Sequence, residues 1–127
     1  MNRRSGPPSA SGQVRTNEPS VLILTSLAAG NRHGYALTKD IAEFAGVTLG
    51  PGTLYGAITR LEERGLIEPT ASEERRQPYR ITASGRAALT EAVRDMRTLA
   101  EVGEVRLGLR GLSRTFGTGT RVVGTTP

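Results

Sequence analysis

Two helical patterns joined by a short glycine-containing turn constrain the fold more than any other feature of this sequence. Residues 35 to 45 place Leu37 and Ile41 on one face of a helix, with charged residues such as Asp40 expected on the outside. Residues 46 to 52 read GVTLGPG, a tight turn whose proline suits the first position of a following helix. The sequence therefore predicts helix, turn and helix in close succession.

The helix after this turn, predicted over residues 51 to 64, has one apolar stripe and one small polar face. Leu54, Ile58 and Leu61 recur at i, i+4 and i+7, so they point to the same side. The residues off that stripe are Thr53, Tyr55, Gly56, Thr59 and Arg60. A second helix with such a free face is what a helix-turn-helix offers to the major groove of DNA.

Two short strands are predicted after Gly65, over residues 66 to 68 and 79 to 82, with a polar loop between them. A winged helix uses such a hairpin loop to hold the sugar-phosphate backbone, because guanidinium groups match phosphate oxygens. The candidate backbone contacts in the loop are Arg75, Arg76 and Gln77. The alternative is a solvated loop of balanced charge, since Glu73 and Glu74 precede them.

Residues 19 to 29 and 83 to 107 are predicted to form the first and last helices. The first is apolar on nearly every side, so the rest of the domain or a second subunit must cover it. The last has a heptad-like seam and a length of roughly 35 to 40 Å, more than a small domain covers alone. A homodimer hides both surfaces, whereas the alternative is that the seam packs within its own chain. The residues assigned to the dimer interface are Val21, Leu24, Leu89, Val93, Met96, Leu99 and Ala100.

Composition excludes most catalytic machinery. The 127 residues fit one domain, and the chain has no cysteine and a single histidine, His33. Thiolate zinc sites, thiol nucleophiles and a serine-histidine relay are thereby excluded, and we expect no metal, no cofactor and no enzymatic activity. His33 itself, at a helix start, is expected to be a cap or turn residue.

The net charge of +5 suggests a polyanionic partner, but the excess lies in the tails. Residues 1 to 18 carry a net charge of +2, residues 108 to 127 carry +3, and residues 19 to 107 contain eleven basic and eleven acidic side chains. Both tails are predicted to be disordered, as solubilising overhangs or as DNA-tracking arms. No apolar run reaches membrane-spanning length and no signal-peptide core follows Met1, so we expect no membrane association and a cytoplasmic location.

Four further side chains can be assigned from their positions. Tyr55 points about 100° away from the buried Leu54, which favours a role toward solvent or DNA. Arg60 shares that face and is assigned to phosphate or base contact, and Lys39 is a phosphate candidate. Tyr79 alternates with apolar neighbours in the second strand and is expected in the core or at the dimer interface.

Six ordered pieces of residues 19 to 107 resemble the short members of the PadR-like transcriptional regulators. They are Leu22 to Leu27, His33-Gly34-Tyr35 with Leu37, Gly52-Thr53-Leu54-Tyr55, Arg60-Leu61-Glu62, Gly65-Leu66-Ile67, and Tyr79-Arg80-Ile81-Thr82 with Gly85 and Leu89. The resemblance implies a dimeric DNA-binding repressor, often released from its operator by a small effector. It also implies that Thr53 and Tyr55 meet DNA and that Tyr35 lies near phosphate. Gly56 stands where the family commonly has proline.

The sequence therefore predicts a mainly α protein with a small β-hairpin wing, namely a winged helix-turn-helix over residues 19 to 82 with a long dimerisation helix over 83 to 107. The expected function is sequence-specific binding of double-stranded DNA by a homodimeric repressor, released by a small effector of unknown identity. The alternative is a winged helix that binds another protein and no longer reads DNA.

Overall fold

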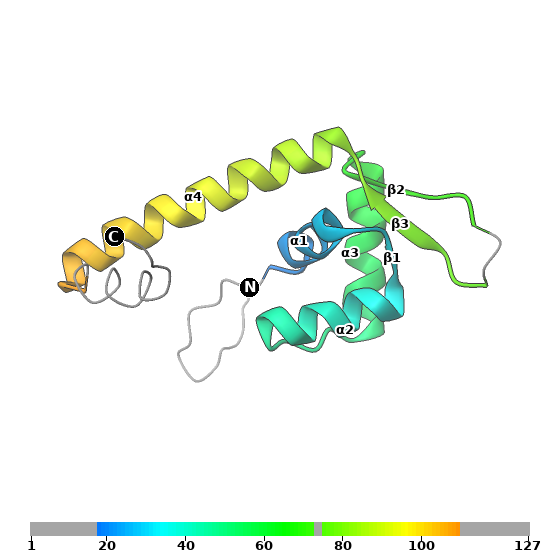
Figure 1. The fold of residues 1–127 in the computed structure, drawn as a ribbon, viewed down its shortest axis with the longest axis horizontal. Helices are drawn as coiled ribbons and strands as arrows, with labels where there is room; N and C mark the ends of the chain where they lie inside the picture. The colour runs from blue at the N-terminus through cyan, green and yellow to red at the C-terminus, as the bar shows by residue number, and fades with distance from the viewer. Residues whose placement is uncertain (1–17, 73–74, 110–127) are drawn as a thin grey trace, which may run out of the picture. The chain divides into compact units, whose positions relative to one another are not determined.

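The computed structural model describes residues 18 to 72 and 75 to 109, and the predicted disordered tails lie almost wholly outside them. Four helices and three short strands follow one another along the chain (Figure 1). They are α1 (Pro19–Ala29), β1 (Arg32–His33), α2 (Gly34–Ala45), α3 (Pro51–Glu63), β2 (Ile67–Pro69), β3 (Pro78–Ile81) and α4 (Ala83–Leu107). The predicted class, mainly α with a β-hairpin wing, is confirmed.

Local capping explains most of the helix boundaries. Pro51 occupies the first turn of α3, as expected, and Gly46 ends α2 with a φ of 69°, a left-handed conformation that favours glycine. The His33 imidazole Nδ1 accepts a hydrogen bond from the backbone N–H of Ala36 at 3.3 Å, which confirms its predicted capping role. Glu18, assigned to the tail by the sequence, instead caps α1 by accepting from the Ser20 N–H at 3.2 Å.

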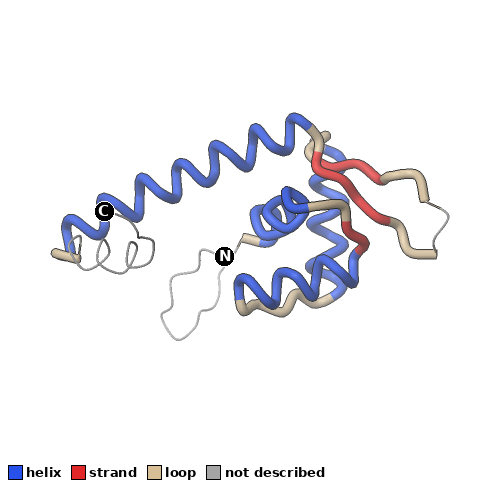
Figure 2. The backbone as a smooth tube through the Cα atoms, in the orientation of Figure 1, coloured by secondary structure: helices blue, strands red, loops and turns tan. Residues whose placement is uncertain are grey.

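The sheet has three antiparallel strands in the order β1-β3-β2, rather than the two-stranded hairpin predicted from the sequence. Ile67 pairs with Ile81 across β2 and β3, and Arg32 pairs with Tyr79 across β1 and β3. The third strand, β1, is only two residues long, too short for any alternation to be recognised. Figure 2 shows the β2–β3 hairpin continuing past its strands into the wing loop.

The core lies where α1, α2 and α3 meet the sheet, and α1 supplies much of it. Leu22, Ile23, Leu24 and Leu27 are all buried within their own chain. The sequence-based assignment of Leu24 to a dimer interface is therefore wrong, because its side chain is 4% exposed and has almost no surface left for a partner. Val21 is half-buried.

The start of α4 is tied closely to the turn between α3 and β2. The Thr82 hydroxyl donates to the Gly65 carbonyl oxygen at 2.7 Å and accepts from the Gly85 N–H at 3.0 Å, so Thr82 caps the N-terminus of α4. A Cβ atom on Gly85 would lie 2.1 Å from the carbonyl oxygen of Leu66, so only glycine allows this approach. Leu89 packs partly against the core.

The chain divides into two compact units, and the boundary lies within α4, between Leu89 and Thr90. The winged-helix unit thus includes the first turns of this helix, and the second unit contains the rest of it. Within residues 18 to 72 and 75 to 109, no helix combines the length and the apolar character that crossing a membrane requires.

Candidate nucleic-acid interface

Helix α3 divides into a buried stripe and an exposed face, as its periodicity predicted. Leu54, Ala57, Ile58 and Leu61 are each at most 3% exposed and anchor the helix in the core. The exposed side chains on the other side are Thr53, Tyr55, Thr59 and Arg60. Gly56, on the same side, is half-buried. The predicted face of small polar residues is therefore accessible in the folded chain.

Tyr55 joins this face to the start of α2. Its side chain is 49% exposed, and its hydroxyl oxygen would lie 2.1 Å from a Cβ atom built on Gly34. The ring thus runs over the first residue of α2, where the absence of a side chain makes room for it. Tyr55 lies at the surface as predicted, but it also packs α3 against α2, which the sequence did not indicate.

Tyr35 follows Gly34 and brings the wing to the same surface. Its ring is 61% exposed, and the guanidinium carbon of Arg76 lies 5.5 Å from the ring centroid, within the range of a cation–π interaction. Three predicted DNA-contacting side chains, Tyr35, Tyr55 and Arg76, therefore come from α2, α3 and the wing and meet on one side of the domain.

The wing loop is closed by a side chain that the sequence had assigned to DNA. The Gln77 amide nitrogen donates to the Thr70 carbonyl oxygen at 2.8 Å and to the Pro78 carbonyl oxygen at 2.7 Å. Both amide hydrogens are thereby used within the hairpin. In the folded chain Gln77 thus holds the wing together, and its assignment to the DNA backbone stays a prediction. Arg75 is exposed.

The side chains of Thr59 and Arg60 both turn back toward the preceding turn of α3. The Thr59 hydroxyl donates to the Tyr55 carbonyl oxygen at 3.0 Å, one turn earlier in the helix. The Arg60 side chain folds back along the helix, so that its Nη1 atom lies 3.6 Å from the position of a Cβ atom on Gly56. The open stretch at Gly56 is therefore overlaid by a guanidinium group.

A partly buried polar cluster links α1, β1 and α2 beneath this surface. Ser26, which is 1% exposed, donates from its hydroxyl to an Asp40 carboxylate oxygen at 2.7 Å. Arg32 lies 3.7 Å from the same oxygen and donates to the Ser26 carbonyl oxygen at 3.3 Å. The expectation that Asp40 faces outward is wrong, since it turns inward to these partners. Its neighbour Lys39 stays exposed on the helix that carries Tyr35.

The pairing of charges separates structural arginines from available ones. Arg32 pairs with Asp40, and Arg80 of β3 pairs with Glu68 across the strands, its Nε donating at 3.0 Å. Within the part of the chain that the structure describes, Lys39 and Arg60 have no such acidic partner. A cation without a carboxylate beside it keeps its full charge available to an anion.

Tyr79 lies beneath this region on β3 and packs against the core, in keeping with one of the two places predicted for it. Burial raises the pKa of its hydroxyl above the ordinary value of 10.0, and the neighbouring Glu62 and Tyr55 raise the pKa further. The Tyr79 side chain therefore stays neutral in the folded chain at neutral pH.

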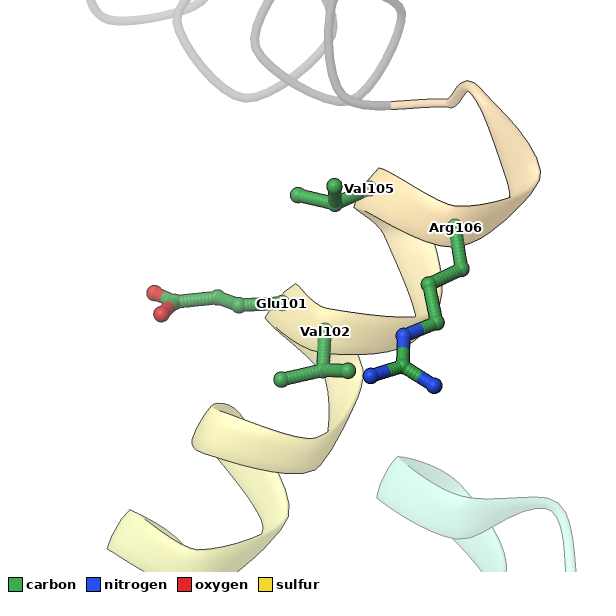
Figure 3. Close-up of a pocket in the computed structure, with 4 residues that line it drawn as sticks. All are labelled: Glu101, Val102, Val105 and Arg106. Atoms are coloured by element: carbon green, nitrogen blue, oxygen red, sulfur yellow. The ribbon is translucent and has the colours of Figure 1, made fainter.

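A second candidate surface runs along α4, where apolar side chains lie open to solvent. Val93 is 44% exposed and Leu99 is 72% exposed, and Met96 and Ala100 are exposed beside them. Val102 and Val105, which the heptad-like seam did not include, are also exposed. Figure 3 shows these two valines with Glu101 and Arg106 around a shallow depression on the last turns.

The fold and the accessible face of α3 define a class of protein, the winged helix-turn-helix DNA-binding proteins. Residues 23 to 91 match the model of the transcriptional regulator PadR-like family, and the chain belongs to that family. Members of this family are transcriptional regulators rather than enzymes.

Two curated relatives show how far the similarity extends. The transcriptional regulator Rv3488 of Mycobacterium tuberculosis is 42% identical over 104 residues, covering 77% of this chain and 89% of the relative. An uncharacterized 37.1 kDa protein in transposon TN4556 of Streptomyces fradiae is 40% identical over 87 residues, covering 68% of this chain. The match spans only 25% of that second protein's own length.

Solved structures agree with the fold. A PadR family transcription regulator from Clostridium difficile superimposes with a TM-score of 0.66 at 27% identity, covering 72% of this chain and 99% of the other. A PadR family transcriptional regulator from Eggerthella lenta gives a TM-score of 0.60 at 31% identity, covering 68% and 79%. The chain is thus a PadR-like transcriptional regulator, which implies regulation through DNA binding.

Proposed function

We propose that this protein is a homodimeric repressor that binds operator DNA with α3 in the major groove and the wing on the adjacent backbone. The observation that carries the proposal is the convergence of Tyr55, Tyr35 and Arg76 beside the exposed face of α3. An α-helix of about 10 to 12 Å diameter fits the major groove, whose width is about 12 Å.

The two ends of the recognition surface have different chemistry. The side chains that face the bases or set the depth of the helix are Thr53, Tyr55, Gly56, Thr59 and Arg60. The N-terminal turn of α3 has no side-chain cap, so its backbone N–H groups and the positive end of the helix dipole suit a phosphate. Arg75 and Arg76 in the wing, with Lys39 and Tyr35 on α2, contact flanking phosphates.

The exposed apolar face of α4 supports the proposed dimer. Leu89 packs partly against the core of its own chain, whereas Val93, Met96, Leu99 and Ala100 are exposed apolar side chains, whose contact with water is unfavourable. A second copy of the same helix covers them, and Val21, which is half-buried, keeps its predicted assignment to the dimer interface. Two copies with two-fold symmetry place their α3 helices on successive major grooves, roughly 34 to 36 Å apart.

Release from the operator by a small effector is the final part of the proposal. Met96 lies on the apolar face of α4, and its flexible thioether adapts to a bound apolar molecule more easily than a branched side chain does. The protein acts in the cytoplasm, where its operator lies.

The proposal is tested by measuring binding to the DNA that flanks the protein's own gene, at several salt concentrations. We expect steep salt dependence, with each neutralised phosphate contributing about 0.9 to the log-log slope. Arg75→Ala with Arg76→Ala should flatten the slope by nearly two such increments. A Leu99→Glu variant, measured by analytical ultracentrifugation, should shift the dimer toward monomer and weaken operator binding.

A second candidate function is a winged helix that binds another protein. The observation in its favour is the balanced charge of residues 19 to 107, with eleven basic and eleven acidic side chains. It predicts no retardation of any duplex at low salt. Retardation of the flanking DNA by the full-length chain would eliminate this alternative as the main function.

A further inference from the structure

Arg60 is an exposed arginine whose guanidinium lies beside Gly56, near the middle of α3. It lies four positions after Gly56, about 6 Å along the helix axis. Long helical side chains lean toward the N-terminus of their helix, and Arg60 follows this rule, with Nη1 3.6 Å from the Cβ position of Gly56. The charge is thereby moved from the last turn of α3 to its middle.

The glycine beneath it determines how close this charge stays to the helix. Around the Cβ position of Gly56, the Arg60 guanidinium is the only group within 4 Å outside the helix's own backbone and the chain neighbours. A Cβ atom there would lie 3.6 Å from the guanidinium, an ordinary van der Waals distance, so only a residue larger than alanine would move the guanidinium away. With glycine there, the outer face of α3 keeps a low profile, and the planar group lies on the part of the helix that can enter a groove most deeply.

The guanidinium also has no competing partner. Arg32 and Arg80 are held by Asp40 and Glu68, whereas Arg60 makes neither an ion pair nor a side-chain hydrogen bond within residues 18 to 72 and 75 to 109. Its fork of N–H donors is therefore free to pair with two acceptors at once.

We infer that Arg60 is a specificity-determining residue that reads a guanine in each half of the operator. Guanine presents two acceptors, O6 and N7, side by side in the major groove, and a guanidinium matches them with two parallel hydrogen bonds. The Arg60 guanidinium leans over Gly56 toward the centre of the exposed face of α3, which favours a base edge over a flanking phosphate. This inference rests on the proposed function, because it assigns one base contact within the proposed DNA interface.

The test starts from the full-length protein and a pool of random duplexes, from which the preferred site is selected. The binding of that site and of its single-base-pair variants is then compared for the wild type, Arg60→Ala and Arg60→Lys. Arg64→Ala is the matched control, because Arg64 is an exposed arginine at the C-cap of the same helix. Thermal unfolding of each variant shows that the fold is retained.

In the wild type we expect one G·C pair in each half-site whose replacement weakens binding by roughly 5- to 150-fold. Arg60→Ala should lose most of that discrimination and Arg60→Lys part of it, with the preferences at other positions kept, while Arg64→Ala should leave all sequence preferences unchanged. Equal weakening of all sequences by Arg60→Ala, with a smaller salt slope, would mean a phosphate contact and would overturn the inference alone. Failure of the wild type to bind any duplex would overturn the inference and the proposed function together.

Discussion

The hydroxyl oxygen of Tyr55 occupies the space that a side chain on residue 34 would need, 2.1 Å from the Cβ position of Gly34. This contact sets the start of α2 against α3, and both helices contribute to the proposed DNA surface. It also places a flexible ring end, rather than backbone, against the glycine.

Gly34→Ala should therefore lower the stability of the fold slightly and the affinity for DNA more strongly. The Tyr55 ring is 49% exposed and can swing outward, so the free energy of unfolding should fall by only about 1 kcal/mol. The displaced ring would then intrude on the DNA side of α3 and lower affinity. Denaturant unfolding and operator titration measure the two effects. In a Tyr55→Ala background the same substitution should have no further effect on affinity, and an undiminished effect there would contradict this explanation.

Gly85→Ala provides the contrasting case. The atom that its Cβ would meet is the Leu66 carbonyl oxygen, again at 2.1 Å, and the Ile81 side chain lies at 2.8 Å. Backbone cannot swing away, so we expect a loss of about 3 kcal/mol in the free energy of unfolding, at the upper end for overpacking. Gly103→Ala, with nothing within 4 Å of its Cβ position, is the control and should stabilise α4 slightly. Equal unfolding midpoints for the two variants would refute the close packing at Gly85.

Ser26→Ala tests the buried cluster between α1 and α2. It removes the hydroxyl that donates to Asp40 at 2.7 Å and leaves the carboxylate with Arg32 alone. A hydrogen bond to a charged group contributes about 1.5 to 3 kcal/mol, so a destabilisation of about 2 kcal/mol is expected. Thr25→Ala, at the exposed neighbouring position, should change stability by less than about 0.5 kcal/mol. Urea unfolding of both variants gives the comparison.

Tyr79 should make the protein less stable in alkali. Because its pKa is raised above 10.0 in the folded chain, the folded state keeps the hydroxyl proton at pH values where the unfolded state releases it. Its contribution to stability is complete below pH 10.0 and is lost as the pH rises through the folded-state pKa. Tyr79→Phe should flatten this alkaline decline, as measured by urea midpoints between about pH 8 and 11. Superimposable pH profiles for the two proteins would show that Tyr79 is not the group responsible.

Gln77→Leu should separate wing structure from phosphate binding. The substitution removes both hydrogen bonds to the Thr70 and Pro78 carbonyl oxygens, so the wing should be cleaved faster in limited proteolysis. Affinity for the operator should fall with an unchanged salt slope, because no cation is removed. Arg75→Ala is the counterpart and should lower the slope by about 0.9 without faster cleavage. An affinity loss without faster cleavage of the wing would instead favour the direct DNA-backbone contact predicted for Gln77 from the sequence.

The helices and their caps were predictable from the sequence because their causes are local. The spacing of Leu54, Ile58 and Leu61 shows which side of α3 is buried, and Pro51 and Thr82 mark where α3 and α4 begin. The free face of α3 follows from the same periodicity. The family resemblance was also carried by short runs of residues at regular separations.

The contacts that assemble the site were not predictable, because each joins residues far apart in the chain. Nothing near Gly34 indicates that Tyr55, 21 positions later, will occupy its open side. The pairing of Arg76 with Tyr35 and of Ser26 with Asp40 depends in the same way on how the helices pack. The hydrogen bond from Gln77 to Thr70 was missed for the same reason, since Thr70 becomes its neighbour only when the hairpin closes.

By itself, the amino-acid order determined which segments are helical, which side of each is apolar, and which polar residues stay on the free side of α3. Those properties depend on side-chain spacing and capping within a few residues. Only the tertiary structure decided that α1 is covered by its own chain and that two residues of β1 complete the sheet. It also decided that residues of α2, α3 and the wing share one surface. These outcomes depend on which residues, far apart in the sequence, pack against one another and exclude water.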